Sequence, residues 1–291
     1  MKKLAFCTTL IVCMLLNLIV LSACNHIIVE CEELDAGQVK IMSTNLRRIS
    51  PVDTDNRTWE NRKSLVVKII QQTKPSIIGM QEVTPQQYKY CKKILSNYQS
   101  DITYRDNLKQ SEGCPIFYHK ELYTLINQGT FWLSETPDVM SKDWESEHYR
   151  ICSYVVLLDN QTHKEFAVLN THLDNVSATA RINSISVILD KIHSLGYPTV
   201  IMGDFNATEN SKAYKIATEA LLDVKYQVEN DYVQTATYNN WGQEHNNRTI
   251  DYFLITPIGF TVNSYEVITT TYDGNYASDH FPIVTTLTLA D

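Results

Sequence analysis

Polar side chains that can hold a metal ion or move a proton stand at the ends of apolar, strand-like runs of this sequence. The apolar residues 200–202 are followed by Gly203 and Asp204, and Asn206 comes two positions later. Gly, Asp and Asn also form ordinary turns, because they tolerate left-handed backbone conformations and bond their own backbone. A carboxylate and a carboxamide at the tip of a rigid strand could instead belong to an active site. The residues at the other strand ends distinguish these two interpretations.

The same arrangement recurs along the chain. In order, the residues are Asn45 after residues 39–42, Glu82 after residues 76–80, Asn170, His172 and Asp174 at the end of FAVLNTHLD, Asp251 at the start of IDYFLI, and Asp279 and His280 before FPIV. Each one alone is weak evidence, because polar turns are common and short motifs often match by chance. The complete ordered set indicates one shared site built from carboxylate, carboxamide and imidazole groups.

This ordered set resembles the endonuclease/exonuclease/phosphatase superfamily of metal-dependent phosphoesterases. The motifs that carry the resemblance are STNLR, MQEV, NTHLD, GDFN, IDYFL and SDHFP, and they extend from about residue 40 to residue 287. The resemblance implies an α/β fold, a four-layer sandwich in which two stacked, mainly antiparallel β-sheets are flanked by helices. It also implies an active site where the strand ends of both sheets meet.

The resemblance further assigns a metal site. Glu82 is similar to the principal metal ligand of the family, with Asn45 and Asp279 beside it. Cleavage of a phosphoester requires neutralisation of the phosphate charge and a water placed in line with the leaving oxygen. Mg²⁺ suits the first task, because it binds through one or two carboxylates plus waters and substrate oxygens. We therefore expect Mg²⁺ as the cofactor, with Mn²⁺ as an alternative.

Four residues match the groups that handle water and phosphate in the family. Asp204 resembles the residue that orients or deprotonates the attacking water, and Asn206 would hydrogen-bond the phosphate or that water. His280 resembles the histidine that contacts the phosphate, and Asp251 its carboxylate partner. A carboxylate bonded to one ring nitrogen fixes the tautomer and favours the charged imidazolium, which stabilises the transition state.

Four further residues are assigned more loosely. His172 resembles a second histidine that protonates the leaving oxygen or binds phosphate, and Glu112 is the candidate carboxylate that supports it. Asn170, in the same NTHLD motif, is expected to contact the substrate. Arg150 resembles a phosphate-contacting arginine, although it could equally be a surface charge near other acidic residues.

Composition and motif variants narrow the function. The chain has 25 Lys and Arg against 33 Asp and Glu, a net charge of −8, which disfavours a protein that coats duplex DNA. The sequence Gln81-Glu82-Val83-Thr84 is similar to the deoxyribonuclease, sphingomyelinase and deadenylase branch of the family. We therefore expect a phosphodiesterase, either a nuclease or a sphingomyelinase-like enzyme. The alternatives are a phosphomonoesterase acting on sugar or inositol phosphates and a non-catalytic surface binding lipoprotein.

Strand and helix patterns alternate from residue 38 onward. Strand-like runs cover residues 39–42, 76–80, 114–118, 125–133, 151–158, 166–173, 199–202, 252–255, 260–268 and 281–289. Helix-like apolar stripes cover residues 59–70, 85–95, 180–195 and about 211–222. Strands outnumber helices, which fits two sheets stacked face to face with helices outside. Because no linker follows residue 38, we expect a single domain over residues 38–291.

The first residues have the pattern of an export signal. Two lysines precede a largely apolar run, and Leu21-Ser22-Ala23-Cys24 resembles the bacterial lipobox, in which the cysteine is lipidated. We expect a signal peptide over residues 1–23, a lipidated Cys24, a tether over residues 24–37, and a lipid-anchored protein of the outer membrane or cell surface. The alternative is an uncleaved membrane anchor, because residues 4–23 could span a bilayer of ~30 Å.

Four cysteines remain after the expected cleavage and lipidation, namely Cys31, Cys91, Cys114 and Cys152. Their spacing matches no zinc-binding pattern. Buried free thiols and disulfides both remain open, because four cysteines in an oxidising compartment allow three pairings.

We expect the mature protein to act as a monomer.

Overall fold

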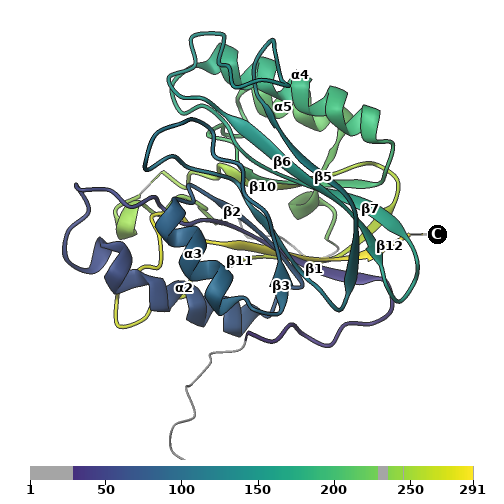
Figure 1. Cartoon of the computed structure of the whole chain (residues 1–291), viewed down its shortest axis with the longest axis horizontal. Coiled ribbons are helices and arrows are strands. Elements are labelled where there is room, and N and C mark those ends of the chain that lie inside the picture. Colours follow the sequence, from purple (N-terminus) through teal and green to yellow (C-terminus); the bar gives the residue numbers. More distant parts are fainter. Residues whose placement is uncertain (1–28, 229–234, 245, 291) are drawn as a thin grey trace, which may run out of the picture.

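Two stacked β-sheets with helices on both outer faces make up the computed structural model of the chain, which describes residues 29–228, 235–244 and 246–290 (Figure 1). Each sheet has six strands. The expected α/β sandwich of four layers is therefore confirmed.

The first sheet has the strand order β11-β12-β1-β2-β4-β3. Its strands are β1 (Gln38–Asn45), β2 (Ile77–Gln81), β3 (Tyr98–Gln99), β4 (Ile116–His119), β11 (Phe260–Val267) and β12 (Ile283–Leu289). The pair β1–β2 is parallel, whereas the other neighbours in this sheet are antiparallel.

The second sheet has the strand order β5-β6-β7-β8-β10-β9. Its strands are β5 (Tyr123–Trp132), β6 (Ile151–Asp159), β7 (Glu165–His172), β8 (Thr199–Asp204), β9 (Leu222–Asp223) and β10 (Asp251–Ile255). The pair β7–β8 is parallel, and the other neighbours are antiparallel.

The parallel pairs bring the polar strand ends together. In a parallel pair the carboxyl ends of both strands lie at the same edge of the sheet. Asn45 at the end of β1 pairs with Gln81, one residue before Glu82. His172 at the end of β7 pairs with Asp204 at the end of β8, and Asp251 pairs with the same Asp204 from the antiparallel β10.

The helices cover the two outer faces (Figure 1). Helices α2 (Trp59–Thr73) and α3 (Pro85–Ile94) pack on the first sheet, and α4 (Ala178–Leu195) and α5 (Lys212–Ala220) pack on the second. Thr84 and Gln87 form a capping box at the start of α3, and the Ser177 side chain caps α4. Three short 3₁₀ turns complete the elements, η1 (Asp55–Arg57), η2 (Val224–Tyr226) and η3 (Asn240–Gly242).

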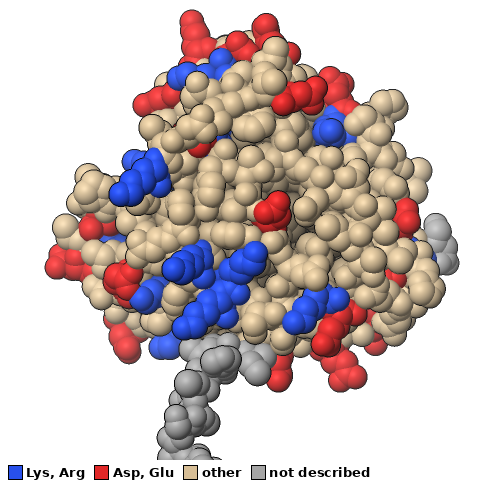
Figure 2. All heavy atoms as spheres, in the orientation of Figure 1, with Lys and Arg blue, Asp and Glu red and all other residues tan. Residues whose placement is uncertain are grey.

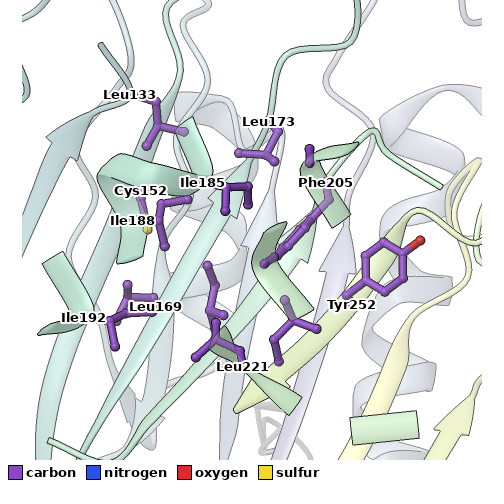
Figure 3. Packing of buried hydrophobic residues seen from close by; sticks show 14 of the residues in the cluster. Leu133, Cys152, Leu169, Leu173, Ile185, Ile188, Ile192, Phe205, Leu221 and Tyr252 are labelled. Carbon is purple, nitrogen blue, oxygen red and sulfur yellow. The ribbon is translucent and has the colours of Figure 1, made fainter. Parts of the chain in front are cut away.

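Apolar side chains next to the polar strand ends anchor those ends in the core. Leu173 follows His172, Phe205 follows Asp204, and Tyr252 follows Asp251, and all three apolar residues belong to the cluster under α4 and α5 (Figure 3). The Tyr252 hydroxyl donates to the carbonyl oxygens of Ala207 (2.9 Å) and Thr249 (2.7 Å). The core packing therefore fixes the positions of His172, Asp204 and Asp251 at the ends of these strands.

The segment before β1 contacts the domain as far back as the structure describes it. Val29 is buried in the cluster between α2, α3 and the first sheet, and the Glu32 backbone N–H donates to the Lys74 carbonyl oxygen at 2.9 Å. The described part of the expected tether thus packs on the fold, while Cys24 and the expected signal peptide lie outside the described residues. No helix among the described residues is long and apolar enough to span a bilayer.

All four cysteines in the described part of the chain are free thiols. Cys91, Cys114 and Cys152 are buried, and burial raises the pKa of each of these thiols. The structure thus selects the free-thiol alternative, and the buried cysteines act as small apolar core residues.

Gly203 allows β8 to approach β7 just before the catalytic candidate Asp204. An added β-carbon at Gly203 would lie 1.9 Å from the Thr171 carbonyl oxygen, and its φ is +143°. We expect Gly203→Ala to lower the free energy of unfolding by at least about 2 kcal/mol, because steric overlap and backbone strain add together. Urea denaturation followed by circular dichroism measures this loss.

Gly274→Ala is the matched control. Gly274 also has a positive φ of +74°, but nothing lies within 4 Å of its added β-carbon. Backbone strain alone should cost about 1 kcal/mol at this position. Equal losses in the two variants would mean that the close approach of β7 and β8 contributes nothing.

Candidate active site

A cavity of about 290 Å³ lies where the ends of β1, β2, β7 and β8 meet. Eight residues selected from the sequence line it, namely Glu82, Glu112, Arg150, His172, Asp204, Asn206, Asp279 and His280. Asn45 and Asp251 stand directly behind this lining, because each hydrogen-bonds a residue in it. Ten of the residues expected to form the site are thus gathered at one place in the fold.

One carboxamide joins the two sheets at the floor of the cavity. The Asn45 Nδ2 donates to Glu82 Oε1 at 3.2 Å and to Asp204 Oδ2 at 3.1 Å. Asn45 and Glu82 belong to the first sheet edge and Asp204 to the second. The Asn45 Oδ1 accepts from the Arg47 backbone N–H at 2.8 Å, which orients the amide so that its nitrogen faces the carboxylates.

The backbone is left-handed at three positions around the cavity, which are Arg47 (φ 52°), Glu82 (φ 59°) and Asn206 (φ 47°). Residues with a β-carbon seldom adopt this conformation, and it persists only where the surrounding structure imposes it. At Glu82 it places the carboxylate where Oε2 accepts the Arg48 backbone N–H at 2.9 Å. Burial would raise the pKa of Glu82, but this hydrogen bond and the charge of His280 hold that pKa below its usual value.

Asp204 lies between the two histidines. Its Oδ2 is 3.3 Å from His172 Nε2 and 3.7 Å from His280 Nε2, and its Oδ1 accepts the Asn206 backbone N–H at 2.8 Å. Burial raises the pKa of Asp204 to about 7 against the attraction of His280, and repulsion from Asp251 and Glu82 acts in the same direction as burial. A carboxylate with a pKa near 7 is suited to take a proton from water at neutral pH.

The histidines differ in charge because their neighbours differ. Burial lowers the pKa of His172 well below its usual value, and Arg150 and Arg105 lower it further, so His172 is neutral. Burial acts in the same direction on His280, but Asp251 and Asp204 outweigh it and raise the pKa of His280 to about 10. The distance from His280 Nδ1 to Asp251 Oδ2 is 2.9 Å, as the expected pairing of these two residues requires.

His172 has different partners from those expected. The distance from its Nε2 to Asn206 Nδ2 is 3.0 Å, so the amide donates and Nε2 accepts in the neutral ring. Glu112, the carboxylate expected beside His172, instead pairs with Arg105, at 2.9 Å between Nη1 and Oε2 and 3.0 Å between Nη2 and Oε1. Arg48 lies 3.7 Å from the same carboxylate.

The cavity contains oxygen ligands suited to a hard divalent cation. Asp204 and Asp279 are buried and Glu82 is half-buried beside them, and burial, together with repulsion from Glu82, raises the pKa of Asp279 despite the charge of His280. Such a cluster fits a bound cation, which removes the repulsion. A second set, Asp204, Asp251 and His280, presents ligand atoms within 4.8 Å of one another, but His280 in that set is charged and bonded to Asp251.

Asn170 is placed differently from the expectation. It is fully buried, and its Nδ2 donates to the carbonyl oxygens of Met80 (2.9 Å) and Pro115 (3.0 Å). Its Oδ1 accepts from Gln81 Nε2 at 2.7 Å. These bonds join the two sheets beneath the cavity and leave the amide no group for a substrate, so Asn170 supports the site from below.

Several lining residues were not selected from the sequence. They are Arg47, Arg48, Arg105, His148, Asn175, Tyr238, Arg248 and Ile250. Most lie in long loops outside the motifs, where no periodic pattern indicates which side chains face inward. Arg47 and Ile250 are exceptions, because Arg47 ends the motif STNLR and Ile250 begins the motif IDYFL.

Several known proteins are similar to this chain in fold and sequence. A solved endonuclease/exonuclease/phosphatase family protein from Bacteroides thetaiotaomicron is 29% identical, with a TM-score of 0.84 over 89% of this chain and 100% of that one. A mannosyl-6-phosphatase from the same organism is 30% identical, with a TM-score of 0.82 over 86% of this chain and 100% of that one. Nocturnin from Drosophila melanogaster is 25% identical over 278 residues, which cover 78% of this chain and 41% of that protein.

The family model of the endonuclease/exonuclease/phosphatase family matches residues 42–280, a range that contains every cavity residue discussed above. Members of this family hydrolyse phosphoester bonds, and the gathered carboxylates, histidines and Asn206 are the groups that such a reaction needs. This chain therefore belongs to the endonuclease/exonuclease/phosphatase family.

Proposed function

We propose that this chain is a divalent-cation-dependent phosphatase that hydrolyses a phosphorylated sugar or a similar small phosphomonoester by attack of water. The observation that carries the chemistry is the position of Asp204, a buried carboxylate with a pKa of about 7 between a neutral and a charged histidine. Glu82, Asn45 and Asp279 would hold Mg²⁺ or Mn²⁺, which when bound supplies positive charge against the phosphate oxygens.

The side chains of the cavity accept the proton, orient the water and stabilise the developing charge. Asp204 accepts the proton of the attacking water, and Asn206 and neutral His172, which are bonded to each other, orient that water. His280, held charged by Asp251, donates to the phosphate as negative charge builds up on its oxygens. His172 was expected to protonate the leaving oxygen, but its low pKa favours a role as an acceptor instead.

The substrate class rests on the cavity and on one relative. A volume of about 290 Å³ is at the lower end of ligand pockets, which have roughly 300–1,000 Å³, and it fits a phosphorylated monosaccharide. The mannosyl-6-phosphatase with 30% identity acts, by its name, on such a compound. Lys and Arg side chains gather on part of the face that Figure 2 shows. Three exposed lysines, Lys89, Lys92 and Lys93, belong to α3 and do not line the cavity.

The cavity volume and the phosphatase relative favour a phosphomonoesterase over the phosphodiesterase that the MQEV motif favours.

The Asp204→Ala variant tests the chemistry. We expect the wild type, as the chain of residues 25–291, to hydrolyse mannose 6-phosphate with Mg²⁺ and to lose this activity in EDTA. The variant should lose about 10²–10⁴-fold in kcat, because the general base is missing. Phosphate release measures the rates.

Asp190→Ala is the matched control, because Asp190 is an exposed acidic residue on α4 outside the cavity. The same panel includes plasmid DNA, RNA, sphingomyelin and bis-p-nitrophenyl phosphate. Cleavage of a diester with no cleavage of any monoester would transfer the function to the phosphodiesterase alternative. An inactive wild type on all substrates would favour the non-catalytic binding lipoprotein.

The cation site predicts a change of stability that does not depend on turnover. Mg²⁺ should raise the free energy of unfolding by about 2.7 kcal/mol at a concentration of 100 times its Kd, because it binds only the folded chain. Glu82→Gln should abolish this gain, whereas Glu60→Gln, on the exposed side of α2, should retain it. Thermal unfolding with and without MgCl₂ measures the effect, and an unchanged gain in Glu82→Gln would move the cation to other ligands.

We also propose that the chain is exported and anchored by a lipid at Cys24, on the evidence of the lipobox-like sequence alone. Cys24→Ser should then release the protein from the membrane fraction or leave an uncleaved precursor. Membrane fractionation and immunoblotting measure the result. Identical fractionation of wild type and variant would show that Cys24 carries no anchor.

A further inference from the structure

The side of the cavity formed by the loops before β4 and β6 carries two buried arginines with unused donors. Arg150 is 4% exposed, and its Nη2 donates to Asn175 Oδ1 at 2.7 Å. Its Nε is 3.5 Å from Asp174 Oδ2, and neither Nε nor Nη1 has a hydrogen-bond partner in the described part of the chain. Buried donors without partners are costly, so we expect these two to bond a ligand or a water.

Arg105 stands beside Arg150. Its two terminal nitrogens bind the Glu112 carboxylate, while its Nε is buried and has no hydrogen-bond partner among the described residues. Burial followed by the charge of Arg105 lowers the pKa of Arg150, and the Glu112 carboxylate offsets only part of this effect. We call these two guanidinium groups at the cavity the arginine wall, which consists of Arg105 and Arg150 and whose charge is offset in part by Asp106, Glu112 and Asp174.

The arginine wall makes no ion pair with the reaction-centre carboxylates Glu82 and Asp204 among the described residues, although its charge lowers the pKa of His172. Within the described residues, the ion pairs of Arg105 and Arg150 at up to 4.0 Å are with Asp106, Glu112 and Asp174. The carboxylates at the reaction centre, Glu82 and Asp204, make their contacts with Asn45 and the histidines instead. Both groups nevertheless border the same cavity, so one small ligand can reach both.

In the proposed function, the cation and charged His280 would bind the scissile phosphate. Arg150 borders the same cavity with a guanidinium whose Nη2 makes one hydrogen bond and whose Nε and Nη1 make none among the described residues, so it can donate to another part of the same ligand. We propose that the arginine wall binds a second anionic group of the substrate, a carboxylate or a non-scissile phosphate. The preferred substrate is then a sugar or polyol phosphate with two anionic groups, an inference that rests on the proposed phosphatase function.

The wild-type enzyme tests this first. The compounds 6-phosphogluconate and glucitol 6-phosphate differ in that one carries a carboxylate where the other carries an alcohol, and fructose 1,6-bisphosphate and fructose 6-phosphate make the same comparison for a second phosphate. We expect kcat/KM to be about 10- to 100-fold higher for at least one doubly anionic member, mainly through KM, because hydrogen bonds between charged groups favour binding by that factor. Ratios near one in both pairs would overturn the inference.

Two variants then locate the effect. Arg150→Met removes the unused donors and leaves Asp174 with its bonds from the Val176 and Ser177 backbone N–H groups. The double variant Arg105→Met/Glu112→Gln removes the second guanidinium without leaving a buried carboxylate unpaired. In each we expect the kcat/KM ratio between the doubly and singly anionic substrates to collapse towards one. Lys109→Met, an exposed change in the loop that carries Arg105, should retain the wild-type ratio.

The outcomes separate the two proposals. A wild type that hydrolyses the singly anionic compounds with no preference for a second anion refutes the inference and leaves the phosphatase function intact. A preference that persists in both arginine variants assigns the second anion to other residues and also refutes it. A wild type that hydrolyses no phosphoester refutes the proposed function itself, and p-nitrophenyl phosphate in the same assay detects that case.

Discussion

The site depends on one carboxamide that holds two carboxylates of opposite sheets. Asn45 Nδ2 donates to Glu82 and to Asp204, at 3.2 and 3.1 Å. Neighbouring carboxylates repel each other, and a neutral donor between them reduces that repulsion without neutralising either. The remaining negative charge stabilises the charged ring of His280 and would favour a bound cation.

The fold can supply this contact because each sheet contains a parallel pair at its centre. The pairs β1–β2 and β7–β8 present their carboxyl ends at adjoining edges, whereas antiparallel neighbours alone would send alternate ends away. Small residues then bring the sheets close beneath the site. An added β-carbon at Gly79 would lie 2.3 Å from Met202 Cε of the facing sheet.

Most of the site could be predicted from the sequence, because its residues occupy strand ends, and strand ends are visible as the points where apolar runs stop. Glu82, Asp204 and His280 come together as the motifs indicated. The partner of Glu112 could not be predicted, since Arg105 reaches it through a long loop whose course depends on tertiary packing. The buried role of Asn170 was missed for a related reason, because the same motif letters fit a residue that faces the substrate or one that joins the sheets.

The two histidines show why residue type alone does not define a catalytic role. Both flank Asp204 and both are buried, yet one is neutral and the other charged. His280 faces the carboxylate of Asp251, which favours the proton, whereas His172 faces the guanidinium groups of Arg150 and Arg105, which disfavour it. The family resemblance assigns an acidic partner to each histidine, Asp251 to His280 and Glu112 to His172. Glu112 is already paired with Arg105, however, and gives His172 no compensating charge. The difference between a proton donor and a proton acceptor is thus set by residues one contact away from the reacting groups.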